Sequence, residues 1–225
     1  MSDYIEVYAV VEGRSEQIFV EKLLKPYMAE KNIFIEATQI SKPGQKGGDV
    51  RFSRAINDIE GFLKQRPDTY VTTLVDYYGI KEWPGLENVP ERQAPATIAA
   101  HLNQATKTEV MGKFAAQQAE RRFIPYVAMH EFEALLFSDS AILADELGIS
   151  EELVQRVLTE CGEPEAINNG PTTAPSKRLD GWSPKGEFAK TTKGIAIAER
   201  IGISQMRAQC PLFDAWLGEF EALVG

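Results

Sequence analysis

The stretch YIEVYAVVEGRSEQIFVEKLL (residues 4–24) decides the fold of this chain. Its first eight residues are β-prone and almost wholly apolar, which is typical of a strand that is covered on both faces. Residues 13–15 then break the apolar run, and apolar residues recur at helical spacing as far as Pro26. The stretch therefore predicts a central strand, a tight turn and a helix.

The same alternation of strands and helices continues downstream. Residues 33–40, 70–75 and 123–129 have the apolar and β-branched character of three further strands. A glycine-rich loop at residues 43–48 and a helix with one apolar face at residues 52–63 separate the first two of them. Strands that alternate with helices predict a parallel sheet with right-handed crossovers.

Helices are also expected on both sides of the fourth strand. A long loop at residues 77–95 leads into a helix at residues 96–121, which has a weak point near Thr106. Another helix is expected to open directly from the end of the fourth strand, at residues 130–137.

The last third of the chain carries no strand pattern. Helical segments are predicted near residues 141–147, 151–161, 194–201 and 213–224. We therefore expect an α/β domain at residues 1–138 and a helical C-terminal cap at residues 139–225 that packs on it.

Composition is that of an ordinary globular protein. The chain has 225 residues, of which 44% are hydrophobic and 25% charged, so a real core is available. Its start has no basic n-region, and no apolar run approaches the roughly 18 residues of a membrane span. Cys161 and Cys210 lie far apart without a CxxC neighbour, which favours reduced packing residues. We expect a cytoplasmic protein with no membrane partner.

The net charge of −9 bears on nucleic-acid binding. Phosphate contacts need clustered Lys and Arg, so any contact with nucleic acid must be local or must be lent by a partner. The segments at residues 42–54 and 176–193 carry enough basic residues to supply it. A solvated loop is the alternative interpretation of each segment.

Four acidic residues follow predicted strands. Glu12, Asp76, Glu131 and Glu133 each fall just past a strand end, where open parallel sheets bind their ligands. Several carboxylates in one cleft repel one another, and Mg²⁺ suits a site of a few carboxylates completed by water and phosphate. The alternative is that each acid simply opens a helix and is favoured there by the helix dipole.

The segments VVEGRSEQIFVEKLL (residues 10–24) and TTLVDYYG (residues 72–79) resemble the Toprim domain of topoisomerases, bacterial primases, small ribonuclease-maturing proteins and overcoming-lysogenization-defect nucleases. The resemblance covers about residues 4–137, and within it the chain most resembles an uncharacterised bacterial family, the domain of unknown function 4276. It implies a three-layer, Rossmann-like α/β fold with a four-stranded parallel sheet.

The resemblance also implies roles for two acids. Glu12 matches the Toprim glutamate, which acts as a general acid or base in strand breakage or helps to place metal. Asp76 matches the first acid of an Asp-x-Asp motif, but Tyr77 and Tyr78 follow it, so the second acid is missing. A two-metal site of the usual kind is therefore in doubt.

Glu131 or Glu133 could restore the missing metal ligand, as in related nucleases that carry a glutamate after a later strand. At positions i and i+2 of a helix the two cannot face the same point. We expect Glu131, nearer the strand end, to be the ligand, with Glu133 as the alternative. His130 could donate to phosphate or carry a proton, or it could be a structural histidine.

Three cationic residues are candidates for contact with phosphate. Arg14 lies in the turn after Glu12, where its guanidinium can hold phosphate or pair with the acids. Lys177 and Arg178 follow a turn in the segment PTTAPSKR and would clamp a phosphodiester if that segment folds over the sheet edge. The alternative is an exposed helix start.

Together these features predict a Mg²⁺- or Mn²⁺-dependent phosphodiesterase that acts on nucleic acid, more readily DNA than RNA. The family resemblance adds a partner ATPase and a setting in phage defence or mobile-element biology, and a homodimer is possible. The alternative is a non-catalytic, Toprim-shaped module that binds a nucleotide or a partner protein.

Overall fold

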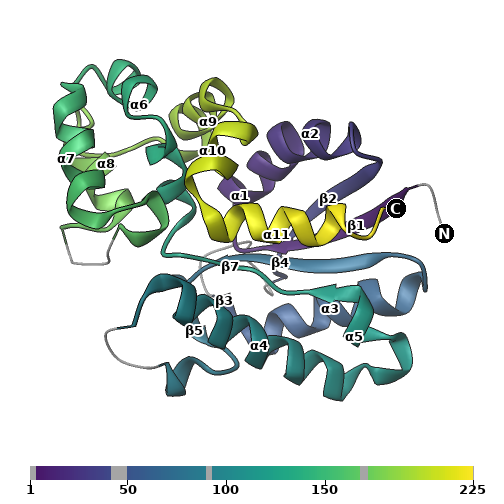
Figure 1. Cartoon of the computed structure of the whole chain (residues 1–225). Helices are drawn as coiled ribbons and strands as arrows, with labels where there is room; N and C mark the ends of the chain where they lie inside the picture. Colours follow the sequence, from purple (N-terminus) through teal and green to yellow (C-terminus); the bar gives the residue numbers. More distant parts are fainter. Residues whose placement is uncertain (1–3, 42–49, 90–92, 168–171, 225) are drawn as a thin grey trace.

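The computed structural model describes residues 4–41, 50–89, 93–167 and 172–224 (Figure 1). Its centre is a parallel sheet with the strand order β2-β1-β4-β6, in which β7 also pairs with β4. The predicted α/β fold with a parallel sheet is therefore confirmed. The strands are β1 (Ile5–Val11), β2 (Ile33–Gln39), β4 (Tyr70–Asp76), β6 (Phe123–Ile124) and β7 (Val127–Ala128).

The fourth strand is interrupted, whereas the sequence predicted one run over residues 123–129. Pro125 separates β6 from β7, and proline has no N–H to donate to the β ladder. The Thr73 side chain bridges the gap: its hydroxyl accepts from Tyr126 N at 3.0 Å and donates to Tyr126 O at 3.1 Å. Pairing with β4 resumes at Val127.

One face of the sheet is covered by helices from the middle of the chain, drawn below the sheet in Figure 1. They are α3 (Phe52–Gln65), α4 (Pro95–Lys113) and α5 (Ala119–Arg122). The helix predicted over residues 96–121 breaks at Phe114 and not near Thr106. Thr106 is compatible with a helix because its hydroxyl donates to Leu102 O at 2.7 Å, and the same hydroxyl accepts from Trp83 Nε1 at 2.9 Å.

A second, two-stranded parallel sheet lies beside this layer. It pairs β3 (Val50–Arg51) with β5 (Ile80–Glu82), so the loop predicted at residues 77–95 contains a short strand and a 3-10 turn at Leu86–Asn88. The glycine-rich loop predicted at residues 43–48 lies outside the described residues.

In Figure 1 the first helical segment and the last helix of the chain, α11 (Pro211–Glu221), lie over the opposite face of the sheet. The first segment runs through α1 (Arg14–Phe19), a π-helical turn (Val20–Leu24) and α2 (Lys25–Ala29). It therefore continues past Pro26, where the sequence predicted its end. Pro26 is tolerated because it lies at the start of α2, just after the π-helical turn, where proline interrupts few helix hydrogen bonds.

The C-terminal residues are helical, as predicted, but two short helices were not expected. α8 contains both Pro175 and Gly181, which obscure its pattern, and α10 is only seven residues long. The helices are α6 (Ser140–Leu147), α7 (Glu151–Cys161), α8 (Pro175–Trp182), α9 (Ile195–Ile201), α10 (Ile203–Gln209) and α11 (Pro211–Glu221). Shorter turns lie at Ala115–Gln117, Phe132–Ser138, Pro164–Ala166 and Lys190–Gly194.

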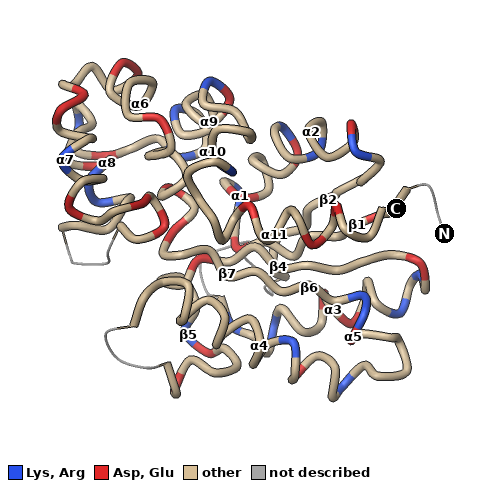
Figure 2. Tube along the Cα trace, in the orientation of Figure 1, with Lys and Arg blue, Asp and Glu red and all other residues tan. Residues whose placement is uncertain are grey.

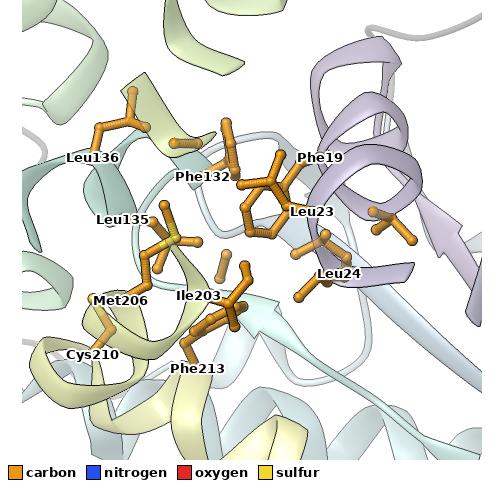
Figure 3. Packing of buried hydrophobic residues seen from close by; sticks show 14 of the residues in the cluster. Phe19, Leu23, Leu24, Phe132, Leu135, Leu136, Ile203, Met206, Cys210 and Phe213 are labelled. Atoms are coloured by element: carbon orange, nitrogen blue, oxygen red, sulfur yellow. The ribbon is translucent and has the colours of Figure 1, made fainter. Parts of the chain in front are cut away.

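The C-terminal helices share one hydrophobic core with α1 and the sheet (Figure 3). Phe19 of α1 lies 4.8 Å from Phe132 and 6.1 Å from Phe213 between ring centroids. On α11, Trp216 stacks on Tyr126 and donates from its indole nitrogen to Thr72 Oγ1 at 2.9 Å. Residues from both ends of the chain therefore fix the position of the sheet and of the turn that begins at Phe132.

Two smaller expectations concern the cysteines and membrane segments. Cys161 and Cys210 are both free thiols, as predicted. Within the described ranges, no helix has both the length and the apolar character needed to cross a membrane.

Candidate functional site

Glu12 and Asp76 meet at the carboxyl ends of the two central strands. Val11 at the end of β1 pairs with Leu74 of β4, so the residues that follow leave the sheet side by side. The backbone N–H of Asp76 donates to Glu12 Oε2 at 3.1 Å. The Glu12 carboxylate is thereby anchored through one oxygen.

Gly79 is the reason that Glu12 fits against the turn after β4. A Cβ atom at residue 79 would lie 2.2 Å from Glu12 Oε2 and 2.5 Å from Oε1, so any larger residue would displace this carboxylate. The backbone N–H of Gly79 closes the turn by donating to Asp76 O at 2.9 Å. Sequence reasoning did not select Gly79; its one signal was a glycine three residues after a strand-end acid.

Asp76 is buried and connects the sheet to the C-terminal half of the chain. Its side chain is only 8% exposed, and Oδ1 accepts from the backbone N–H of Phe132 at 2.8 Å. Phe132 opens the 3-10 turn Phe132–Ser138, which takes the place of the helix predicted at residues 130–137. All seven residues of this turn are buried, so Asp76 holds a tightly packed segment against the strand end.

Two further buried acids lie at the same end of the sheet. Glu16 of α1 is 6% exposed, and Glu133 of the 3-10 turn is 1% exposed. Sequence reasoning missed Glu16, although its spacing from Phe19 and Val20 puts it on the buried face of the helix. Glu133 was named only as the alternative to Glu131.

In the part of the chain that the structure describes, Lys190 is the cation that lies against these acids. Its Nζ lies 2.6 Å from Glu133 Oε1. The two side chains differ in exposure, since that of Lys190 is 43% exposed and that of Glu133 only 1%. The geometry is that of an ion pair, and neither Glu133 oxygen has a hydrogen-bond partner among the described residues. Lys190 falls in the basic segment at residues 176–193, from which the sequence analysis had selected Lys177 and Arg178.

The electrostatics are those of crowded, dehydrated carboxylates. Burial is the largest cause that raises the pKa of Glu12, Glu16, Asp76 and Glu133, and repulsion among the acids raises each pKa further. The pKa of Glu16 rises to about 7. Burial lowers the pKa of Lys190, but its attraction to Glu133 and to Asp76 outweighs burial and leaves that pKa raised. Among the described residues, these four acids thus share the charge of one ammonium group.

Glu131 and His130 make other contacts. The two carboxylate oxygens of Glu131 accept from Ser176 N at 2.8 Å and from Ser176 Oγ at 2.9 Å, so Glu131 holds the first turn of α8. His130 is buried, donates from Nδ1 to Ile167 O at 2.9 Å and stacks on the ring of Tyr78. Burial lowers the pKa of His130 below its ordinary value, which favours the neutral imidazole.

The three predicted phosphate contacts differ in how free they are. Arg14 is exposed and has no hydrogen bond or ion pair with any described residue. Lys177 is exposed and lies 3.3 Å from Asp180, and Arg178 donates from Nε to Thr173 O at 2.9 Å. Their role as a phosphate clamp stays a prediction.

Carboxylates alone make a donor set that suits Mg²⁺ or Mn²⁺. Glu133 is the kind of buried acid that a cation would satisfy, and Lys190 already lies against its Oε1. The present positions of the carboxylates do not complete a site. Within the described residues, no group of three or more His, Cys, Asp and Glu side chains could hold a metal ion together. The chemistry of the donors therefore fits a divalent cation, whereas their arrangement requires side-chain rotation to bind one.

We expect Glu16→Gln to stabilise the protein above pH 7 but not near pH 4.5. Because the folded-state pKa of Glu16 is about 7 and its ordinary value is 4.5, folding favours the protonated form, and stability is lost as the pH rises between these values. Removing the charge should raise the free energy of unfolding at pH 8 by about 3 kcal/mol. Urea denaturation at pH 5 and pH 8 measures the difference.

The control for this prediction is Glu21→Gln, which changes an exposed acid on the same helical segment. It should alter the free energy of unfolding by less than about 0.5 kcal/mol at either pH. A Glu16→Gln protein whose stability relative to the wild type did not depend on pH would contradict the raised pKa.

Comparison with known proteins identifies a family but no characterised relative. A family model described as "Domain of unknown function (DUF4276)" matches residues 11–221, which is most of the chain. No curated protein and no solved structure matches the chain. The match spans the acids, Gly79 and Lys190 alike.

Proposed function

Since the chain belongs to the DUF4276 family, whose function is unknown, we propose from its site that it is a Mg²⁺- or Mn²⁺-dependent phosphodiesterase acting on nucleic acid. One observation carries this proposal: Glu12, Glu16, Asp76 and Glu133 crowd the carboxyl end of a parallel sheet with raised pKa values and one shared ammonium group. A purely structural site would be expected to pair buried charges one to one.

Hydrolysis would form a bond from a water oxygen to phosphorus and break the bond to the leaving nucleoside oxygen, which takes up a proton. When bound, the divalent cation would supply Lewis-acid polarisation of the phosphate and countercharge for it. Glu12 would accept the proton of the attacking water, because Asp76 N fixes its position and a raised pKa makes it the stronger base. Asp76, held by Phe132 N, would orient the cation.

The resemblance to Toprim domains supports the same reading, and the site suggests a substitute for the missing second acid. Tyr78 occupies that position in the sequence. We propose that Glu16 and Glu133 serve in its place as oxygen donors, since both are buried and interact electrostatically with Asp76. Glu131, the donor expected from the sequence, already accepts two hydrogen bonds from Ser176.

The charge distribution supports a partner-dependent enzyme. Lys and Arg positions are interspersed with Asp and Glu positions along the described trace (Figure 2), and the net charge is −9. Such a surface repels a polyanion unless a basic partner offsets it. We therefore propose that a partner ATPase provides the basic surface that binds DNA. The proposal places the protein in the cytoplasm, in a phage-defence or mobile-element setting, and includes a homodimer.

A second candidate function is a non-catalytic module that binds a nucleotide or a partner protein. The contact between Lys190 and Glu133 favours it, because a protein-borne cation already lies where a metal would neutralise the acids. The two functions differ in whether a divalent cation binds.

We expect Mn²⁺ to raise the melting temperature of the wild-type protein by mass action, and Asp76→Asn to abolish that rise. Asparagine keeps an oxygen for the N–H of Phe132 but lacks the charge that attracts the cation. Differential scanning fluorimetry over a Mn²⁺ titration measures both proteins.

The matched control is Asp68→Asn, which changes an exposed acid just before the other end of strand β4. It should keep the full rise in melting temperature. Equal stabilisation of the Asp76→Asn protein would remove the metal site from this cleft and favour the binding module.

A further inference from the structure

We propose that Lys190 is an intramolecular counter-ion that occupies the acid site and that a divalent cation binds there by displacing it. This inference rests on the proposed metal-dependent function and concerns the regulation of the same site. Its starting point is the contact of 2.6 Å between Lys190 Nζ and Glu133 Oε1. Lys190 lies in the segment between α8 and α9, more than fifty residues after Glu133 in the chain.

The ammonium of Lys190 acts on the whole acid group and not on one partner. It attracts Glu12, Glu16 and Asp76 as well as Glu133. A metal ion in the cleft would have to satisfy the same carboxylates. Two cations cannot both lie against these oxygens without strong repulsion, so the site holds one or the other.

The two partners differ in their freedom to move. Glu133 is buried within the 3-10 turn Phe132–Ser138 and cannot reach solvent, whereas Lys190 is 43% exposed on a long, flexible stem. When Lys190 leaves, its ammonium can be hydrated at once. The carboxylate of Glu133 would then remain buried without a charge partner, which is costly unless another cation replaces the lysine.

The proposal also accounts for the arrangement of the acids. While Lys190 lies against Glu133, no three acidic side chains of the described residues are placed to hold a metal ion. Departure of the lysine frees Glu133 Oε1 and permits rotation toward Asp76. Only molecules from which Lys190 has left the site can bind the cation. The apparent affinity is therefore the intrinsic affinity multiplied by the fraction of such molecules.

The test measures Mn²⁺ affinity by isothermal titration calorimetry for wild type, Lys190→Met and Lys193→Met. Lys190→Met removes the competing ammonium and should tighten Mn²⁺ binding by about 10-fold or more. Lys193→Met is the matched control: Lys193 lies one turn further along and pairs with Glu146, outside the acid group. It should bind Mn²⁺ as the wild type does.

Two outcomes separate this inference from the proposed function. Equal or weaker Mn²⁺ binding by Lys190→Met overturns the displacement while leaving a metal-dependent enzyme intact. Absence of binding in all three proteins overturns both. Tighter binding by Lys190→Met, or binding by that variant alone, supports displacement.

A measurement on the wild-type protein keeps the inference testable if Lys190→Met does not fold. The side-chain ammonium of Lys190 can be followed by ¹⁵N nuclear magnetic resonance, with its signal assigned by its loss in Lys190→Arg. Addition of Mg²⁺, up to the concentration that saturates the calorimetric titration, should shift this signal or broaden it by exchange with water. A signal that stays unchanged at saturation overturns the displacement.

Discussion

Glu12→Gln is expected to lower the rate of plasmid nicking in Mn²⁺ by about 10²- to 10⁴-fold, the usual cost of losing a general acid or base. Glutamine keeps the shape of the side chain and an oxygen for the N–H of Asp76. It cannot take a proton from water, and it removes one negative charge from the group that would hold the cation. The fold should persist, because Glu12 is half-buried and its carboxylate is destabilised by burial.

Gly79→Ala should reproduce much of this loss with Glu12 intact. The added methyl group would lie 2.2 Å from Glu12 Oε2, so the carboxylate must leave its hydrogen bond with Asp76 N. The end of a glutamate side chain can move, and the free energy of unfolding should fall by only about 1 kcal/mol. The matched control is Gly61→Ala on α3, where nothing lies within 4 Å of the new atom.

Gly61→Ala should leave nicking unchanged and raise the free energy of unfolding by about 0.5 to 1 kcal/mol, because alanine favours the helix. The assay follows conversion of supercoiled plasmid to open circles, with and without the proposed partner ATPase. Without the partner, weak activity is expected even from the wild type. If Glu12→Gln and wild type cleave equally, the activity belongs to another site or a contaminant, and the binding module becomes the better proposal.

The strands could be predicted from sequence because their signals are local. Residues 4–11 and 70–75 are short apolar runs with polar breaks at both ends, and each became a central strand of the sheet. Pro125 was also visible in the sequence, but its effect on the fourth strand could not be predicted. Whether a proline ends a strand or only interrupts it depends on a distant neighbour, here the hydroxyl of Thr73.

The residues of the candidate site likewise divide into those that local sequence signals predict and those that depend on distant parts of the chain. Glu12 and Asp76 were predictable because parallel strands deliver their carboxyl ends to one edge. Lys190 was not, because no local pattern tells which of several cations in a basic segment returns to the sheet. The preference for Glu131 over Glu133 rested on distance from the strand end, whereas their environments depend on Ser176 and Lys190, forty-five and fifty-seven residues further along the chain.

Arg122→Met is expected to lower the free energy of unfolding by about 3 to 5 kcal/mol, the largest effect on stability that we predict. Arg122 is 2% exposed, and among the described residues its guanidinium donates only to neutral oxygens. Its Nε bonds to Thr69 O at 2.7 Å, and its Nη1 bonds to Leu63 O at 3.0 Å and to Gln117 O at 2.8 Å. Nη2 donates to Arg66 O.

Leu63 O lies in the last turn of α3, where helix carbonyls have no partner within the helix. Arg66 O also accepts from Thr69 Oγ1 at 3.2 Å. Arg122 therefore joins the end of α3 and the start of β4 to the 3-10 turn at Ala115–Gln117. Methionine fills much of the space but donates nothing, so buried acceptors would be left unsatisfied, at about 1 to 3 kcal/mol each before water enters. Arg121→Met, at the exposed neighbouring position, should change stability by less than about 0.5 kcal/mol.

Urea denaturation of the two variants measures the difference, and an unchanged m-value would show that the folded state alone lost stability. Arg122→Lys should fall between wild type and Arg122→Met, since one ammonium group cannot reach carbonyls that a planar guanidinium spans. Because this cluster lies at the amino end of β4, away from Asp76, the Mn²⁺-dependent rise in melting temperature should survive in every folded variant. Loss of less than about 1 kcal/mol in Arg122→Met would mean that water replaces the guanidinium at little cost, and that hydrophobic packing holds the sheet rather than this contact.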